Sequence, residues 1–178
     1  MLGAGVLGTA AVGLGSLPQL GSSPNRTVTL VEESGVPESR QFASALVDSG
    51  FAGNVIRIDR SLNGLLQELE AVGGTVIGLT SDPAAMIAGQ LLGERGARPR
   101  YFWQHHYTGG RWHHRTDGIA RLIESTTHAW PVAIAQQLQA AIGSTSSQAS
   151  NTCTSGVCAL LSNSPGMLVS WVYEFEGY

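Results

Sequence analysis

The stretch YFWQHHYTGGRWHHRT, residues 101–116, decides how the second half of the chain folds. It contains four of the five histidines of the protein. A Gly-Gly pair between aromatic and β-branched residues is typical of a β-hairpin with a two-residue turn, because both central residues of that turn need a positive φ. The stretch therefore predicts two antiparallel strands joined at Gly109 and Gly110.

Counting outward from this turn places His106 opposite His113 and His105 opposite His114. Side chains alternate along a strand, so the hairpin has two faces of different composition. One face carries Trp103, His105, Tyr107, Trp112 and His114, and the other carries Phe102, Gln104, His106, Arg111, His113 and Arg115. Each face thus holds a cross-strand histidine pair, whose Cβ atoms we expect about 5 Å apart.

The pair His105 and His114 has two interpretations. Two imidazoles at this spacing can bind one metal ion, and imidazole suits Zn, Cu or Ni, so both are candidate metal ligands. A metal site usually needs a third or fourth ligand, and the cysteine–histidine spacings of structural zinc sites are absent from the sequence. The alternative is that these residues are half-buried strand pairs that pack well. No other cofactor is predicted.

Length and composition exclude several classes of function. The 178 residues carry a net charge of −3 and are 43% hydrophobic, which is enough for one domain with a real core. No basic run is present, which argues against a nucleic-acid partner. Lysine is absent, so no lysine Schiff base can form.

The first twenty residues, MLGAGVLGTAAVGLGSLPQL, are uncharged and apolar. This segment resembles the hydrophobic core of an export signal, and its glycine- and alanine-rich composition is similar to that of bacterial twin-arginine leaders. The resemblance implies an exported protein, periplasmic or anchored on the outer side of a membrane, with membrane contact through residues 1–20. A glycine-rich tail or a buried apolar helix is the alternative, since the basic region of a leader is missing. Residues 21–26 form a polar linker, so we expect residues 1–26 as leader or anchor and 27–178 as one α/β domain.

Cys153 and Cys158 are separated by four residues, whereas a thioredoxin-type site has two between its cysteines. In an oxidising compartment the pair is predicted to form a small-loop disulfide. In the cytosol both would be ordinary thiols.

Three strand–helix units occupy residues 27–92. Strands are predicted at 27–31, 54–58 and 75–79, each followed by an apolar helical pattern. This order predicts a three-layer Rossmann-like or flavodoxin-like fold, with a mostly parallel sheet and antiparallel hairpins added at one edge. Further along, a helical pattern covers residues 119–142 with a break at Pro131, and strands are predicted at 157–161 and 167–175.

Ligands of open parallel sheets bind at the carboxyl ends of the strands. The candidate binding residues at those ends are Glu32, Glu33, Ser34, Asp59, Thr80 and Ser81. Asp82 follows as the predicted N-cap of a helix. No G-x-G-x-x-G or Walker pattern follows the first strand, which argues against a dinucleotide site.

Two function classes remain. A serine at a strand end, a hairpin histidine and Asp59 could form a hydrolytic site, although no G-x-S-x-G elbow is present. The aromatic residues Trp103, Tyr107 and Trp112 could instead contact a protein, because such residues dominate interface hot spots. We expect an exported, non-catalytic binding or accessory subunit of a larger complex, with a protein partner or a second copy bound. The alternative is a metal-dependent or hydrolytic enzyme that uses the hairpin histidines and the strand-end acids.

Overall fold

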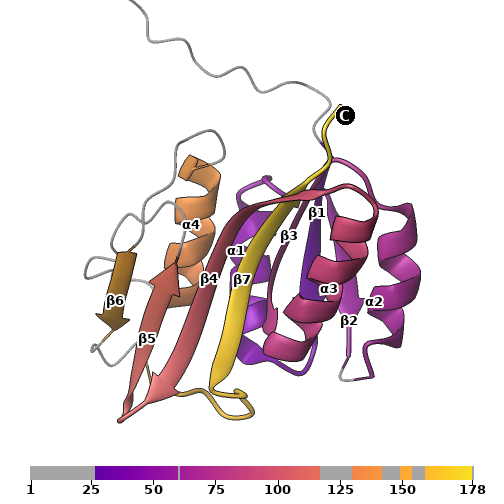
Figure 1. Ribbon diagram of the computed structural model, residues 1–178. Helices are drawn as coiled ribbons and strands as arrows, with labels where there is room; N and C mark the ends of the chain where they lie inside the picture. Colours follow the sequence, from indigo (N-terminus) through magenta and orange to yellow (C-terminus); the bar gives the residue numbers. More distant parts are fainter. Residues whose placement is uncertain (1–26, 60, 117–129, 142–148, 154–158, 178) are drawn as a thin grey trace, which may run out of the picture.

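The computed structural model describes residues 27–59, 61–116, 130–141, 149–153 and 159–177. In this part of the chain the protein is α/β, and its strands form one mixed sheet in the order β2-β1-β3-β7-β4-β5-β6 (Figure 1). The predicted leader and linker, residues 1–26, lie outside the described residues.

The first half consists of the three predicted strand–helix units. They are β1 (Val28–Glu33), α1 (Pro37–Asp48), β2 (Asn54–Ile58), α2 (Asn63–Glu68) with the short 3-10 helix η1 (Leu69–Ala71), β3 (Thr75–Ser81) and α3 (Asp82–Glu94). β1 pairs in parallel with β2 on one side and with β3 on the other. The prediction of parallel strands with crossover helices is confirmed for this half.

The second half is antiparallel. It contains β4 (Arg98–Thr108), β5 (Arg111–Thr116), α4 (Trp130–Ala141), β6 (Ala149–Cys153) and β7 (Met167–Glu174). The predicted antiparallel strands at one edge are confirmed, but a mostly parallel sheet is wrong, because only two of the six strand pairings are parallel. The reason is that β7 returns from the far end of the chain and lies antiparallel beside β3, where a fourth parallel strand would otherwise lie.

Two further expectations change. Residues 159–161 are not a strand, and the edge strand β6 is instead formed by residues 149–153, where no strand was predicted. Of the helix expected over residues 119–142, the structure describes α4, in which Pro131 is the second residue, whereas residues 119–129 lie outside the described part of the chain. Proline is tolerated there, since the first turn of a helix has no acceptor for its N–H.

The hairpin has the predicted turn and register. Gly109 and Gly110 have φ values of 60° and 79°. His105 lies opposite His114, and His106 lies opposite His113. Local turn chemistry is therefore sufficient to set this register.

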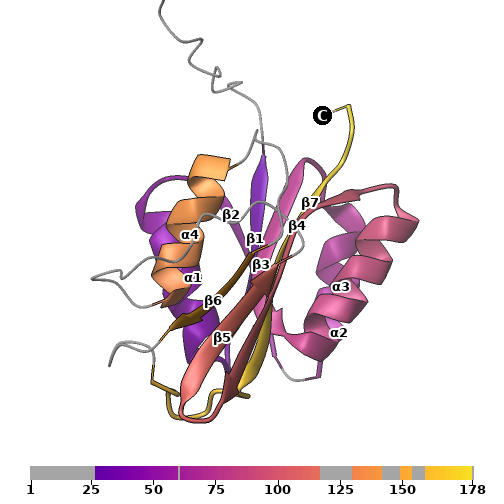
Figure 2. The same cartoon turned by 60° about the vertical axis from the view of Figure 1, so that its left-hand side comes forward.

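Helices cover the sheet on both faces, as Figure 2 shows. α1 and α4 pack on one face, over a core that includes Phe42, Leu46, Trp130 and Ile134. α2 and α3 pack on the other, over a core that includes Leu65, Ala88 and Leu92. On this second face α3 lies over β3 and β7, whereas β4 and β5 have no helix of the described residues in front of them (Figure 1).

Trp171 of β7 holds β7 against β3. Its indole lies over Gly78, where an added Cβ would come within 2.4 Å of the ring carbon Cζ2. Its Nε1–H donates a hydrogen bond to the Thr80 hydroxyl at 3.1 Å. The ring is buried, so its N–H needs a hydrogen-bond partner within the protein. The ring can reach this position only if residue 78 has no side chain.

We predict that Gly78→Ala lowers the free energy of unfolding by about 1–3 kcal/mol, because the methyl group overpacks the Trp171 ring. Gly93→Ala in α3 is the matched control, since nothing lies within 4 Å of its Cβ position. That change should leave stability unchanged or raise it by up to about 1 kcal/mol through helix propensity. Urea unfolding measures both; an unchanged midpoint for Gly78→Ala would contradict the packing described.

Candidate functional site

The two histidines on the inner face of the hairpin contact each other directly. Nδ1 of His105 and Nδ1 of His114 are 2.8 Å apart. Nε2 of His105 lies 2.9 Å from Oγ of Ser170 in β7. All three residues are 0% exposed. Three adjacent strands thus place a serine and two imidazoles in one buried line.

Tryptophan rings enclose this line. Trp130 at the start of α4 lies over both imidazoles, with ring centroids 4.5 Å from His105 and 4.9 Å from His114. Trp112 is nearly parallel to His114 at 6.4 Å, and Trp103 lies 6.0 Å from His105. These contacts keep solvent away from the imidazoles.

Burial keeps both imidazoles neutral. It lowers the pKa of His114 to about 3, with a smaller effect from the nearby His113. Burial also holds the pKa of His105 well below its usual value, assisted by His114 and His106. A neutral imidazole has one N–H and one bare nitrogen, so one ring donates to the other and Ser170 completes the chain.

The direction of the hydrogen bonds along this line decides whether the last nitrogen, Nε2 of His114, carries a hydrogen. Nε2 of His114 is buried and has no hydrogen-bond partner among the residues that the structure describes. If His105 donates to Ser170, His114 donates to His105 and its Nε2 is a bare lone pair. In the reverse direction Ser170 donates and Nε2 of His114 is an unpaired N–H. Either arrangement leaves one unsatisfied polar atom, which costs about 1–3 kcal/mol.

The predicted metal ligands His105 and His114 are thus joined by a hydrogen bond. Two nitrogens bound to a tetrahedral zinc ion lie about 3.3 Å apart, given bond lengths of about 2.05 Å. The observed 2.8 Å is shorter, so the rings would have to separate to hold a metal. Among the described residues, no group of three or more His, Cys, Asp or Glu side chains could hold a metal ion.

At the carboxyl ends of the parallel strands, the structure brings Glu33 and Ser81 together. One carboxylate oxygen of Glu33 accepts the Ser81 N–H at 2.7 Å, and the other lies 3.1 Å from the Ser81 hydroxyl. The Glu33 N–H donates to Oγ of Ser39 at 2.9 Å. Glu33 is only 3% exposed, so these bonds satisfy a buried carboxylate.

This arrangement corrects the expected N-cap of α3. The cap residue is Ser81, whose side chain makes no capping bond, and Asp82 is the first residue of the helix. The Glu33 carboxylate, reaching over from β1, supplies the negative group at this helix start. The position that an anion would take here is therefore occupied by Glu33.

The remaining strand-end residues point elsewhere. Glu32, which is partly buried, forms an ion pair with the exposed Arg57 at 3.5 Å, a surface contact worth about 1 kcal/mol or less. Asp59 accepts hydrogen bonds from Ser61, which lower the pKa of its carboxyl. Ser34 is exposed. The hydrogen bonds of the histidine line join His105 to His114 and Ser170, and none of them involves these strand-end residues.

Thr80 is buried and accepts the Trp171 N–H, so its hydroxyl serves packing. The aromatic residues expected at an interface lie on the inner face of the hairpin. Trp103 is 1% exposed, Trp112 is 0% exposed and Tyr107 is half-buried. They form core rather than surface.

Two buried polar residues escape sequence reasoning. Ser170 falls on the inner face by alternation with Leu168, but its pairing with the hairpin joins distant parts of the chain. Glu38 in the first turn of α1 is fully buried, and neither carboxylate oxygen makes a hydrogen bond of normal geometry. Burial raises its pKa, partly offset by the nearby Ser164 hydroxyl and the backbone of Leu161. An acidic residue at a helix start usually indicates an exposed charge, so the sequence contains no signal for it.

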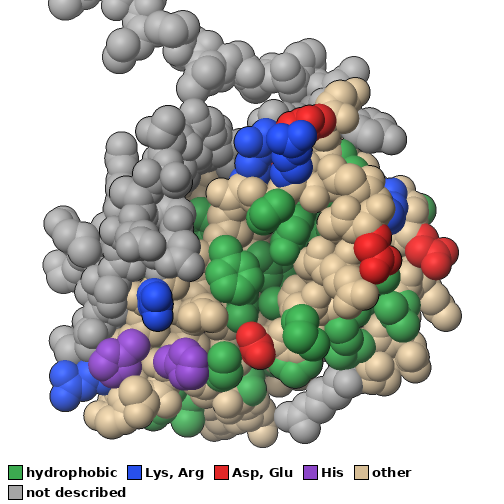
Figure 3. All heavy atoms as spheres, in the orientation of Figure 1, with side chains coloured by type: hydrophobic (Ala, Val, Ile, Leu, Met, Phe, Trp, Pro, Cys, Tyr) green, Lys and Arg blue, Asp and Glu red, His purple; other side chains and the backbone are tan. Residues whose placement is uncertain are grey.

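On the outer face of β4 and β5, no helix of the described residues covers the sheet (Figure 1). Phe102 is 37% exposed, and on the same face Arg115, His106 and Arg111 are exposed at successive positions toward the turn. Figure 3 shows this side, with hydrophobic side chains at the centre and basic or histidine side chains near its margins. We call these four residues the outer hairpin face.

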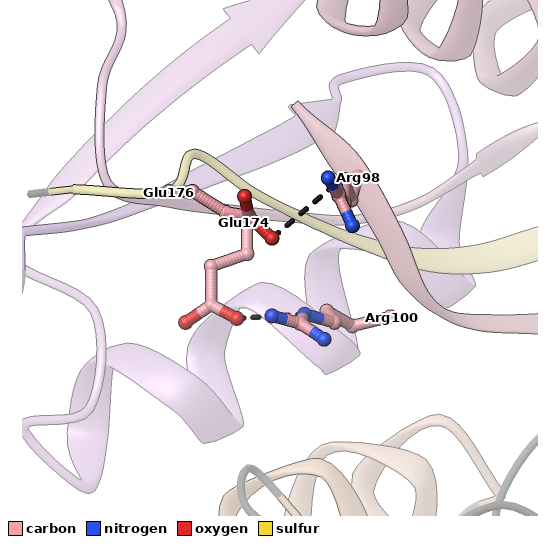
Figure 4. A network of polar contacts seen from close by, with 4 residues as sticks. All are labelled: Arg98, Arg100, Glu174 and Glu176. Atoms are coloured by element: carbon pink, nitrogen blue, oxygen red, sulfur yellow. Dashed lines mark hydrogen bonds and ion pairs between the residues drawn. The ribbon is translucent and has the colours of Figure 1, made fainter. Parts of the chain in front are cut away.

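At the far end of β4, two arginines are already paired (Figure 4). Arg98 lies 3.2 Å from the Glu176 carboxylate, and Arg100 lies 2.8 Å from that of Glu174. The positive charge at that end is therefore balanced within the chain.

The predicted disulfide would join Cys153 to Cys158, and Cys158 lies outside the described residues. No disulfide is seen within the described residues. In the part of the chain that the structure describes, none of the helices has the length and apolar character needed to cross a membrane.

The neutral histidine pair makes stability depend on pH. An unfolded histidine binds a proton with a pKa near 6.5, whereas the pKa of His114 is about 3 and that of His105 is well below 6.5. Below pH 6.5 the unfolded chain therefore binds more protons than the folded one. We predict that the free energy of unfolding is fully maintained above pH 6.5 and falls toward pH 3, by up to about 1.4 kcal/mol per pH unit for each histidine.

Urea unfolding between pH 5 and pH 7 measures this slope. The double variant His105→Gln/His114→Gln should lose most of it. The double variant His106→Gln/His113→Gln changes the neighbouring pair on the outer face and should retain it. Equal slopes in the two double variants would contradict the account of the buried pair.

Comparison with known proteins gives no match: no family model, no curated protein and no solved structure is similar to this chain. Its function is therefore inferred from the geometry and charge of its own residues.

Proposed function

We propose that this chain is a non-catalytic binding or accessory subunit of a larger protein complex, and that the outer hairpin face is its contact surface. The observation that carries this proposal is the face of β4 and β5 that no described helix covers, where an exposed Phe102 (37%) shares the face with exposed arginine and histidine side chains. Aromatic and arginine side chains are the residues most enriched in interface hot spots.

The layer structure supports this assignment. α3 packs on β3 and β7 through a stripe of small residues that includes Ala84, Ala85 and Ala88. Among the helices that the structure describes, this layer therefore lies over β3 and β7, and the sheet continues beyond it (Figure 1). A partner seated on β4 and β5 would extend that layer, with α3 beside it.

The alternative, a metal-dependent or hydrolytic enzyme, is supported less well. Such an enzyme would need His105 and His114 to reach a substrate, and the Trp130 ring lies over both imidazoles. The strand-end acid with the most buried environment, Glu33, already uses both carboxylate oxygens on Ser81.

Export remains a proposal that rests on residues 1–20 alone, with a periplasmic or membrane-anchored location on the outer side. The finer fold assignment is also a proposal: β2, β1 and β3 with their helices form a flavodoxin-like unit. Its support is the strand order β2-β1-β3, which is the start of the flavodoxin-like order.

Purification of the tagged full-length protein from its own host, followed by native mass spectrometry, tests the function. We expect a stoichiometric protein partner that is lost in Phe102→Ser. The matched control is Leu66→Ser in α2, because Leu66 is 45% exposed on the opposite half of the molecule. A bare chain, or loss of the partner in both variants, would refute the proposal, and a dimer of the pure chain would identify the partner as a second copy.

A further inference from the structure

The strands of the hairpin carry charge of one sign. Residues 98–116 contain four arginines and four histidines and no aspartate or glutamate, although the whole chain has a net charge of −3. Positive charge is therefore concentrated on this element while the rest of the molecule is acidic. Such an asymmetry guides the choice of partner more than it adds affinity.

The two ends of the hairpin differ in how this charge is compensated. Arg98 and Arg100 pair with Glu176 and Glu174, so that end is neutralised within the chain (Figure 4). Arg111 and Arg115 of β5 are exposed and make no hydrogen bond or ion pair with any described residue. The arginines that have no acidic partner among the described residues therefore lie nearer the Gly109-Gly110 turn.

The strand geometry sets the spacing of these two charges. Arg111 and Arg115 lie on the same face of β5, four residues apart, which corresponds to about 13 Å along the strand. On the neighbouring strand β4, Thr108 is opposite Arg111 and Gln104 is opposite Arg115. The exposed His106 lies midway between these two positions. Two guanidinium groups on a regular strand form a fixed pair of sites for planar anions.

Carboxylates fit this surface better than the phosphates of a nucleic acid. Affinity for nucleic acid grows with the number of phosphates that are neutralised, and typical binders contact about 6–10. Here two uncompensated arginines are available on a chain with a net charge of −3. The exposed Phe102 on the same face adds an apolar contact that a protein partner can use.

We propose that the partner is an acidic polypeptide surface, whose carboxylates pair with Arg111 and Arg115 while an apolar side chain packs near Phe102. This inference rests on the proposed function, because it names the chemistry of the partner at the same surface.

Fluorescence anisotropy of the full-length chain with fluorescein-labelled octaglutamate tests the charge requirement, in low salt so that screening is weak. Exposed ion pairs are worth about 0.2–1 kcal/mol. Binding should therefore weaken by about 1.4-fold to fivefold in Arg111→Gln and in Arg115→Gln, and by up to about 25-fold in the double variant. Arg57→Gln, which removes an exposed arginine from β2 at the opposite edge of the sheet, should bind as the wild type does.

Three results would overturn the inference. They are no binding at millimolar octaglutamate, an equal loss in Arg57→Gln, and tighter binding of an oligothymidylate of the same charge, which would point to phosphates. A separate outcome keeps the two proposals apart. If the host partner is lost in Phe102→Ser but retained when both Arg111 and Arg115 are changed to Gln, the contact surface stands and its acidic partner does not.

Discussion

The antiparallel strand β7 between β3 and β4 joins the two halves of this protein. Neighbouring residues of β7 anchor opposite faces of the sheet, because side chains alternate along a strand. On one face Trp171 packs over Gly78 and donates its N–H to Thr80. On the other face Ser170 reaches His105. These two adjacent side chains of β7 therefore attach the parallel strands on one side and the hairpin on the other. The hydrophobic cores on both faces of the sheet depend on this strand.

The hairpin applies the same alternation to its own two faces. Inside, His105 and His114 are buried under Trp130 and stay neutral, since charging an imidazole there would cost its full hydration. Outside, one rung away in each strand, the side chains meet solvent and carry the positive charge of the hairpin. The inner face thus stabilises the fold, and the outer face is left for recognition. Because side chains alternate along a strand, consecutive residues of this histidine-rich stretch belong to different faces, one in the core and one available for binding.

Much of this could be predicted from local patterns. The Gly109-Gly110 turn predicted the hairpin register, and apolar periodicity predicted the three strand–helix units. The position of β7 could not be predicted, because its pairing with β3 and β4 joins residues about 60 to 100 positions apart. The contact of Glu33 with Ser81 was missed for a similar reason: both residues were named, but only the parallel register of β1 and β3 brings them together. Which hairpin face is buried was also undetermined, since that depends on where α4 packs.

The central claim is that the alternation of side chains along the hairpin separates the buried pair His105 and His114 from the exposed His106 on the outer face. Carbethoxylation of the native protein with diethyl pyrocarbonate, followed by peptide mass spectrometry, tests it directly. The account predicts that His106 is modified rapidly in the folded protein, whereas His105 and His114 react only after unfolding in urea. Modification of His105 or His114 at the rate of His106 in the native state would contradict it.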